Sequence, residues 1–255
     1  MLSFAFSPCP NDTFAFHALV HGLVDGPAVK PRLEDIEALN DLAERGAADL
    51  VKISVAAYGR VAERYALLRS GGAAGFGTGP VLVAREEREP GGLIAIPGER
   101  TTAALLLGLL GTFDTKPMRF HEIPDAVLSG DVDCGVLIHE GRFTFEDHGL
   151  VLVRDLGEVW ESRHNLPVPL GAVAVRRDLG NETARELEAA VRASVVYARE
   201  HPEASRDYVA AHAQEMAPDV VRRHIELYVN EYTLDLDETA VTTLLGDVPL
   251  PVFAT

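Results

Sequence analysis

The sequence is poor in cysteine: its 255 residues include two, Cys9 and Cys134. Neither belongs to a Cys-X-X-Cys pair or to another spacing that is typical of a metal site. Two isolated thiols also do not indicate a small fold held together by disulfide bonds. We therefore expect neither a bound metal nor a disulfide framework.

Basic residues are also scarce. The chain has 23 lysines and arginines against 39 aspartates and glutamates, which gives a formal net charge of −16. Such a surface repels phosphate backbones and anionic lipids, so nucleic acids and membrane surfaces are poor candidates for partners. An anionic ligand would need a local site built from a few basic groups and helix N-termini.

Long apolar runs and nucleotide-binding motifs are absent as well. No stretch approaches the ~20 apolar residues of a membrane span, and the N-terminal residues lack the pattern of a signal peptide. The glycine-rich residues 70–80 contain neither the dinucleotide fingerprint nor a P-loop. We therefore expect a cytoplasmic protein that does not insert into a membrane, and the sequence gives no sign of a nucleotide cofactor.

The sequence does contain short aliphatic runs that alternate with segments of helical periodicity, a pattern typical of α/β proteins. The predicted strands are residues 2–6, 33–36, 49–53, 81–85, 93–96, 118–123, 134–138, 151–153 and 172–176. The predicted helices are residues 14–21, 36–46, 55–58, 103–107, 124–129, 181–200 (capped by Asn181) and 220–232.

A polar turn, Ser7-Pro8-Cys9-Pro10-Asn11-Asp12-Thr13, follows the first predicted strand. Its two prolines fix the backbone and remove two hydrogen-bond donors. Asn11, Asp12 and Thr13 are residue types that cap helices, so one interpretation is a well-capped helix from residue 14. The other is a loop that faces a ligand at a helix N-terminus.

Two further places combine polar side chains with the end of a strand. Lys52 lies inside an apolar run, where its charge requires a partner, and Ser54 begins the next helix. Thr101 and Thr102 begin another helix, and a second threonine is more than a cap requires. Hydroxyls beside free backbone N–H groups suit a carboxylate or a phosphate.

A strand that ends at a histidine is the most suggestive feature. The aliphatic residues 135–138 stop at His139, and Glu140, Gly141 and Arg142 follow. Ligands of open α/β sheets lie just beyond the carboxyl ends of strands, where a histidine can act as a base near neutral pH. The alternative is that His139 only ends the strand and hydrogen-bonds a neighbouring carbonyl.

The order of the elements predicts two α/β lobes. Similar strands at residues 81–85 and 172–176 suggest a chain that leaves one lobe, builds a second and returns. We predict a discontinuous first lobe of residues 1–84 and 173–255, with a helical C-terminal part, and an inserted lobe of residues 85–172. This is the plan of bilobal solute-binding proteins, whose ligand lies between two lobes that close by hinge motion.

Five segments of the chain resemble 1,4-dihydroxy-6-naphthoate synthases, enzymes of the futalosine route to menaquinone (vitamin K2). The likeness runs over nearly the whole chain, and its first motif is specific. Gly141 replaces an expected serine, and Glu99-Arg100 stand where a histidine is common. The segments are Ser7-Pro8-Cys9-Pro10-Asn11-Asp12-Thr13-Phe14, Lys52-Ile53-Ser54, Arg69-Ser70-Gly71-Gly72-Ala73, Pro97-Gly98 with Thr101-Thr102, and Leu137-Ile138-His139-Glu140 with Arg142-Phe143-Thr144.

The resemblance implies a periplasmic-binding type II fold used as an enzyme. Its small-molecule substrate would be cyclic dehypoxanthine futalosine, cleaved without cofactor to 1,4-dihydroxy-6-naphthoate and a three-carbon fragment, dihydroxyacetone. By this analogy His139 is the general base of a carbon–carbon lyase. The expected substrate-binding residues are Asn11, Asp12, Thr13, Lys52, Ile53, Ser54, Thr101, Thr102 and Arg142.

Two alternatives stay open at this point. The first is a non-catalytic protein of the same fold that binds a small carboxylate, because a fold does not by itself imply catalysis. The second is a sister enzyme of the same pathway, a chorismate dehydratase. The placement of His139 favours chemistry over binding alone, and the motif of residues 7–14 weighs against the dehydratase.

Overall fold

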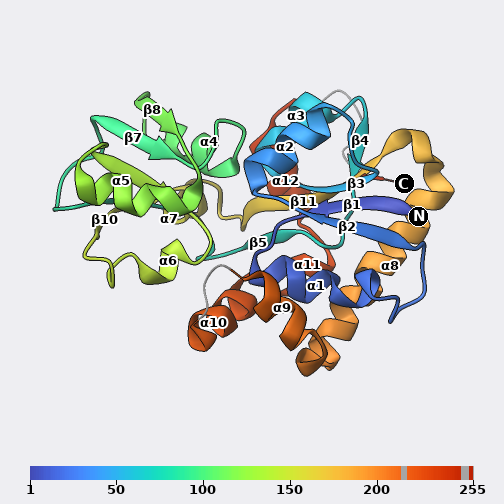
Figure 1. Ribbon diagram of the computed structural model, residues 1–255. Coiled ribbons are helices and arrows are strands. Elements are labelled where there is room, and N and C mark those ends of the chain that lie inside the picture. The colour runs from blue at the N-terminus through green and yellow to red at the C-terminus, as the bar shows by residue number, and fades with distance from the viewer. Residues whose placement is uncertain (214–216, 248–252, 255) are drawn as a thin grey trace. The chain divides into compact units, whose positions relative to one another are not determined.

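The structure is a computed structural model that describes residues 1–213, 217–247 and 253–254. Its contacts divide the chain into two compact units (Figure 1). The first unit comprises Met1–Gly75 and Pro169–Thr255, and the second comprises Phe76–Val168. The sequence places these boundaries after residues 84 and 172 instead.

The first unit is built on a mixed sheet of six strands in the order β2-β1-β3-β11-β4, with β5 paired to β11. β1 runs parallel to both β2 and β3, whereas β11 is antiparallel to β3 and β4. Its strands are β1 (Leu2–Phe6), β2 (Val29–Leu33), β3 (Leu50–Ser54), β4 (Tyr65–Leu67), β5 (Ala73–Gly75) and β11 (Val168–Arg176).

Helices cover both faces of this sheet, with α2, α3 and α12 on one side and α1, α8 and α11 on the other (Figure 1). The α-helices are α1 (Pro10–Val20), α2 (Ile36–Glu44), α3 (Tyr58–Val61), α8 (Gly180–Glu200), α9 (Arg206–His212), α10 (Pro218–Tyr228), α11 (Glu231–Leu234) and α12 (Glu238–Leu245). Short 3-10 helices lie at η1 (Val55–Ala57), η3 (Arg177–Leu179) and η4 (Pro202–Ser205).

Aromatic packing fixes α1 against the sheet. The rings of Phe4, Phe6 and Phe16 lie 4.9–5.2 Å apart between centroids, and all three side chains are fully buried. Helix α8 packs beside α1, where the hydroxyl of Ser194 donates to the carbonyl of Ala15 at 2.7 Å. Burial of large apolar rings is a strong stabilising term, so the N-terminus of α1 is held rigidly at the end of β1.

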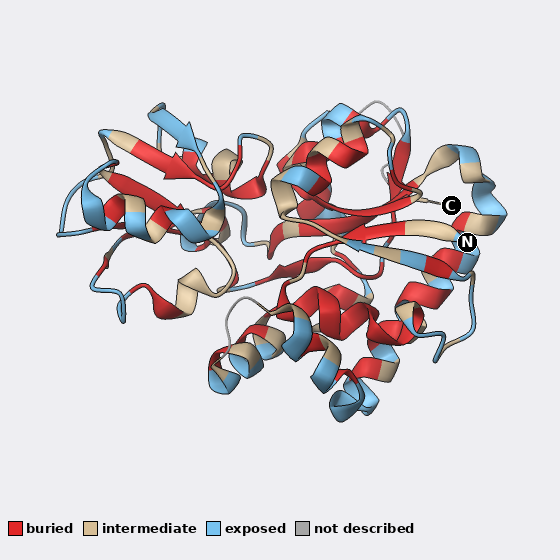
Figure 2. Cartoon of the chain, in the orientation of Figure 1, coloured by how far each residue is buried: buried red, intermediate tan, exposed pale blue. Residues whose placement is uncertain are grey.

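The second unit has a five-stranded sheet in the order β10-β6-β9-β7-β8, whose inner strands are buried (Figure 2). β9, β7 and β8 are parallel, and β6 is antiparallel to β10 and β9. Its elements are β6 (Val81–Ala84), β7 (Leu93–Ile96), α4 (Thr102–Gly108), β8 (Asp114–Pro117), η2 (Phe120–Glu122), α5 (Ile123–Ser129), β9 (Cys134–Leu137), α6 (Gly141–Thr144), β10 (Val151–Asp155) and α7 (Leu156–His164).

Most predicted elements are confirmed, but two predicted strands are wrong. The chain forms β2 at Val29–Leu33, not at residues 33–36, and β8 at Asp114–Pro117, not at residues 118–123. Both are edge strands. An edge strand is held by backbone pairing on one side and tolerates proline and charged residues, so hydrophobic alternation did not reveal them.

Two predicted helix starts are also wrong. α1 begins at Pro10, and its N-cap is Cys9 without a side-chain cap bond. Proline suits the first helical position because its missing N–H would have no partner there. Likewise α8 begins at Gly180 after Leu179, so Asn181 lies inside the helix instead of capping it.

The sequence predicts no membrane-spanning segment, and the structure can be compared with this prediction over the residues that it describes. In residues 1–213, 217–247 and 253–254, no helix is both long and apolar enough to span a bilayer.

Candidate functional site

In the first unit, the candidate residues gather where two parallel strands end. β1 and β3 are neighbours, with Ala5 paired to Val51, so their carboxyl ends meet at the same edge of the sheet. β1 leads into the turn of residues 7–9 and then into α1, while β3 ends at Ser54. The topology therefore brings the predicted residues of the two segments together.

Lys52 and Asp12 form a buried ion pair at this edge. The Lys52 Nζ lies 2.9 Å from Asp12 Oδ1 and also donates to the carbonyl of Gly71 at 2.6 Å. The other carboxylate oxygen, Asp12 Oδ2, accepts from the Ser7 hydroxyl at 2.8 Å and from the Ser7 N–H at 3.3 Å. The partner that the apolar surroundings of Lys52 require is thus Asp12, 40 residues away.

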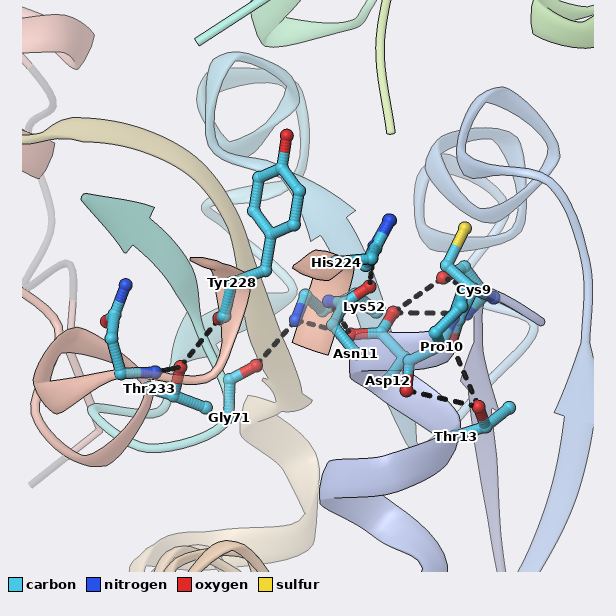
Figure 3. Close-up of polar contacts among 12 residues, drawn as sticks. Cys9, Pro10, Asn11, Asp12, Thr13, Lys52, Gly71, His224, Tyr228 and Thr233 are labelled. Carbon is cyan, nitrogen blue, oxygen red and sulfur yellow. Dashed lines mark hydrogen bonds and ion pairs between the residues drawn. The ribbon is translucent and has the colours of Figure 1, made fainter. Parts of the chain in front are cut away.

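Asn11 extends this network to a histidine that the sequence did not single out. Asn11 Nδ2 donates to Asp12 Oδ1 at 3.0 Å, and Asn11 Oδ1 lies 2.9 Å from His224 Nε2 (Figure 3). His224 belongs to α10 and is 1% exposed. Its helix position alone suggests a surface histidine, but the ring of His224 turns toward α1 and is buried there.

The network returns to α10 through a second route. Gly71, whose carbonyl accepts from Lys52, donates its N–H to the carbonyl of Thr233 at 2.8 Å. The hydroxyl of Thr233 donates to the carbonyl of Tyr228 at 3.0 Å (Figure 3). Gly71 has φ +82°, and a Cβ there would lie 2.8 Å from Val173 and Val191, so this position requires glycine. Together these hydrogen bonds form a connected polar line that begins and ends on α10. It runs from His224 through Asn11, Asp12, Lys52, Gly71 and Thr233 to Tyr228.

The other predicted residues of the first unit are held by internal bonds. The Ser54 N–H donates to Asn40 Oδ1 at 2.9 Å, and Asn40 Nδ2 donates back to the Ser54 hydroxyl at 3.2 Å. Asn40 comes from α2 and is fully buried. Ile53 is also fully buried, and the Thr13 hydroxyl donates to the carbonyl of Cys9 at 3.0 Å. Ser54, Ile53 and Thr13 therefore support this edge of the sheet from inside the first unit.

In the second unit, Thr101, Thr102 and His139 lie at a comparable edge. β7 and β9 are parallel neighbours, with Ala95 paired to Gly135, so Ile96 and Leu137 end on the same side. The Thr101 hydroxyl accepts from the Ala104 N–H at 3.2 Å and donates to the carbonyl of Gly98 at 2.8 Å. The side chain of Thr101 is therefore the N-cap of α4.

His139 has an unusual backbone. Its φ is +54°, one of two positive values at residues other than glycine in the part of the chain that the structure describes. The left-handed region costs free energy for a residue with a Cβ, and such residues cluster at functional sites. The ring is half-buried and meets the ring of Phe120 edge-on, with centroids 5.1 Å apart.

Arg142 is bound within its own unit. Its Nη2 lies 2.6 Å from Asp155 Oδ2, and its Nη1 donates to the carbonyl of Gly79 at 2.7 Å. The other oxygen of Asp155 caps α7 by accepting from the N–H groups of Gly157 and Glu158. The guanidinium thus ties α6, which begins two residues after His139, to the start of α7.

Both cysteines are buried free thiols. Burial, the larger cause, raises the pKa of Cys134 and so keeps it protonated. Among residues 1–213, 217–247 and 253–254, no group of three or more histidine, cysteine, aspartate or glutamate side chains is arranged to hold a metal ion.

The two edges therefore offer different chemistry. The first unit joins Asn11, Asp12 and Lys52 in one buried polar network, while the second places a strained histidine at a strand end. Sequence reasoning missed His224, Asn40 and Asp155. For Asp155 a local signal existed, because an aspartate directly before a helix is a common N-cap.

The family described as "Menaquinone biosynthesis" matches residues 2–245 of the chain. A 1,4-dihydroxy-6-naphthoate synthase of Thermus thermophilus is 50% identical over 93% of this chain and 89% of its own length. A 1,4-dihydroxy-6-naphthoate synthase of Streptomyces coelicolor is 48% identical over 96% of this chain and 90% of its own length. The resemblance read from the sequence motifs is confirmed.

Solved structures agree on the fold. A protein from Archaeoglobus fulgidus superimposes with a TM-score of 0.91 at 38% identity, over 95% of this chain and 94% of its own. A protein from Candida albicans with the generic periplasmic-binding-protein fold has a TM-score of 0.64 at 11% identity, over 96% of this chain and 90% of its own. The predicted fold class, a periplasmic-binding-protein-like α/β fold, is confirmed.

Proposed function

The chain belongs to the 1,4-dihydroxy-6-naphthoate synthase family of menaquinone biosynthesis, and from this premise we propose its substrate and its catalytic base. The substrate is cyclic dehypoxanthine futalosine, which the protein cleaves to 1,4-dihydroxy-6-naphthoate and dihydroxyacetone. The reaction is a carbon–carbon bond cleavage. It redistributes the atoms of one substrate between two products without an external oxidant or reductant, so we propose that it needs no cofactor.

The observation that carries the proposal is the position of His139. Its side chain follows the end of β9, and its backbone is held at a φ of +54°. A strained, half-buried histidine at the carboxyl end of a strand is a functional-site candidate on physical grounds. Imidazole changes its protonation state near neutral pH, as a general base must.

In the proposed reaction, His139 removes a proton from a sugar hydroxyl. The O–H electron pair becomes a carbonyl bond, and the adjacent carbon–carbon bond breaks in a retro-aldol step. The released electron pair enters the ring system, which becomes an aromatic naphthalene. A positioned base contributes about 10²–10⁴-fold to such a step, and formation of the aromatic ring drives it forward.

The remaining candidates bind the substrate or hold those that do. We assign substrate contacts to Asn11 and Asp12 in the first turn of α1. Thr13, Ile53 and Ser54, which are buried, hold the edge of the sheet that presents these contacts. Lys52 acts through its ion pair with Asp12, whose carboxylate it neutralises.

In the second unit, Thr102 and the N–H groups at the start of α4 bind a substrate oxygen, and Thr101 holds the end of the helix. Arg142 acts through Gly79 and Asp155 on the segment that carries His139. Candidate residues come from both units, so we propose that both are needed for turnover.

The test is to incubate the purified protein with cyclic dehypoxanthine futalosine and to follow naphthoate by absorbance and mass. His139→Ala should lower kcat by about 10²–10⁴-fold. His139→Asn is the matched variant, because asparagine also tolerates a positive φ but is no base near pH 7. It should fold as the native protein does and lose the same activity.

Other outcomes would point elsewhere. His148→Ala, at an exposed position of the same unit, should leave turnover unchanged. Normal turnover by His139→Ala would overturn the assignment of the base. Binding of the substrate without product would favour the non-catalytic alternative, and dehydration of chorismate would favour the sister enzyme.

A further inference from the structure

The orientation of the Asn11 side chain determines which nitrogen of His224 carries a proton. The Asp12 carboxylate, paired with Lys52, can only accept hydrogen bonds, so the Asn11 group 3.0 Å from Asp12 Oδ1 must be the amide nitrogen. The amide oxygen of Asn11 then faces His224 at 2.9 Å. Because that oxygen can only accept, Nε2 of His224 must be the donor.

The bond between His224 and Asn11 joins segments 213 residues apart in a buried part of the first unit. The exposed fractions are 1% for His224, 8% for Asn11 and 3% for Asp12. A buried amide that loses a hydrogen bond costs free energy, so the side chain rotates toward other hydrogen-bond partners. The hydrogen bond from His224 therefore fixes the orientation of the Asn11 amide more strongly than a bond at the surface would.

α10 holds this polar line at two points. His224 binds one end through Asn11, and the carbonyl of Tyr228, one turn further along α10, accepts from Thr233 at the other end. Gly71 connects Thr233 to Lys52. Asp12 lies between these anchors, with its Oδ1 shared by Asn11 and Lys52.

We propose that His224 is a positioning residue for the reaction. Its Nε2–H fixes the amide of Asn11, and Asn11 in turn fixes the carboxylate of Asp12 in the orientation that binds the substrate. The inference rests on the proposed function where it concerns substrate, whereas the direction of the hydrogen bonds does not depend on it. His224 itself touches neither substrate nor reacting atoms in this proposal.

Three variants separate the donor from the bulk of the ring. In His224→Gln, the side-chain amide reaches the place of Nε2 and can donate to Asn11. In His224→Asn the amide reaches only the place of Nδ1, and His224→Leu fills the space without a donor. We expect the glutamine variant to keep KM within about twofold of native. The asparagine and leucine variants should raise KM about tenfold, the effect of losing a buried hydrogen bond.

The distinction between KM and kcat excludes a merely structural role. A variant that only lowers the amount of folded protein reduces the apparent kcat and leaves KM unchanged, whereas loss of a binding orientation raises KM. His148→Gln, at an exposed position of the second unit, is the control and should change neither constant. A leucine variant with native KM, or a glutamine variant as impaired as the leucine variant, would overturn the proposal.

The proton on Nε2 gives a test that needs no activity. In protein labelled with ¹⁵N-histidine, the His224 signals are assigned by their absence from the His224→Gln spectrum. We expect a protonated Nε2 in the native protein, and a weakened protection of that proton from exchange in Asn11→Ala. An Nε2 without a proton would overturn the proposal even if the leucine variant does not fold. If the native protein makes no naphthoate, the proposed function fails, and this spectrum still decides on His224.

Discussion

Lys52 and Asp12 form an ion pair with 2.9 Å between Nζ and Oδ1, and their side chains are 5% and 4% exposed. The lysine belongs to β3 and the aspartate to the first turn of α1. When one partner of such a buried pair is removed, the other charge stays buried without compensation, which destabilises the fold. The same residues lie among the candidates for substrate binding, so in the proposed function stability and substrate binding share one contact.

Removal of one partner should be strongly destabilising. We expect Lys52→Met to lower the free energy of unfolding by about 3–5 kcal/mol, because it leaves the Asp12 carboxylate buried without a counter-charge. The double variant Lys52→Met with Asp12→Asn should lose less than the sum of the two single changes. Urea unfolding followed by circular dichroism measures both.

The control for this pair is an exposed one. Arg222 and Glu226 form an ion pair on α10 with side chains 63% and 60% exposed. Arg222→Met should change the free energy of unfolding by less than about 1 kcal/mol. Equal effects of the Lys52 and Arg222 substitutions would contradict the assignment of a buried pair.

Asp155 combines two roles that substitutions can separate. Asp155→Asn keeps an oxygen for the N–H groups of Gly157 and Glu158 but loses the charge toward Arg142. Asp155→Ala loses both, so it should be less stable than Asp155→Asn by about 1 kcal/mol, the usual worth of a helix cap. Thermal unfolding of the two variants beside the native protein gives the order.

The matched cap is Asp237, which accepts from the Ala240 N–H at 2.8 Å at the start of α12. There the asparagine variant should resemble native and the alanine variant should lose about 1 kcal/mol. If Asp155→Asn is also as stable as native, the bond to Arg142 contributes nothing to stability.

Gly157 should not tolerate a side chain, although it lies in the first turn of a helix. A Cβ on Gly157 would lie 2.8 Å from the Cα of Gly79, whose carbonyl binds Arg142. We expect Gly157→Ala to lower the free energy of unfolding by about 1–3 kcal/mol, as overpacking does. Gly59→Ala in α3, with no atom within 4 Å of the added carbon, should instead raise it by about 0.5–1 kcal/mol. A stabilising effect at both positions would refute the close approach.

His17 predicts how stability depends on pH. Burial, and to a smaller extent the neighbouring His21, lower the pKa of His17 below its ordinary value of 6.5. Between the native pKa and 6.5 the unfolded chain therefore binds more protons than the native one. The stability that comes with a neutral, buried His17 is therefore fully present above pH 6.5. It is lost as the pH falls from 6.5 through the native pKa, so the thermal unfolding midpoint should fall over this range.

Substitution tests the origin of this slope. His17→Gln should flatten the pH dependence of the unfolding midpoint below pH 6.5, whereas His148→Gln, at an exposed position, should leave it unchanged. A native slope in the His17 variant would show that other groups cause it.

Local sequence was a good guide wherever burial leaves a pattern. The aliphatic run of β9 predicted a strand that ends at His139, and the apolar surroundings of Lys52 predicted a partner for its charge. It failed at β2 and β8, because both edge strands are defined by backbone pairing on one side and carry charged residues and proline. It also misplaced the start of α1, where Pro10 occupies the first turn and not the turn before it.

The sequence by itself determined the α/β class, the family, and the polar residues that follow each strand. Tertiary structure decided what those residues bind: Asp12 for Lys52, His224 for Asn11, and Asp155 for Arg142. The physical reason is that strand and helix periodicity depends on neighbours a few residues apart. A hydrogen bond between residues 11 and 224 instead depends on how the sheet brings α1 and the C-terminal helices together.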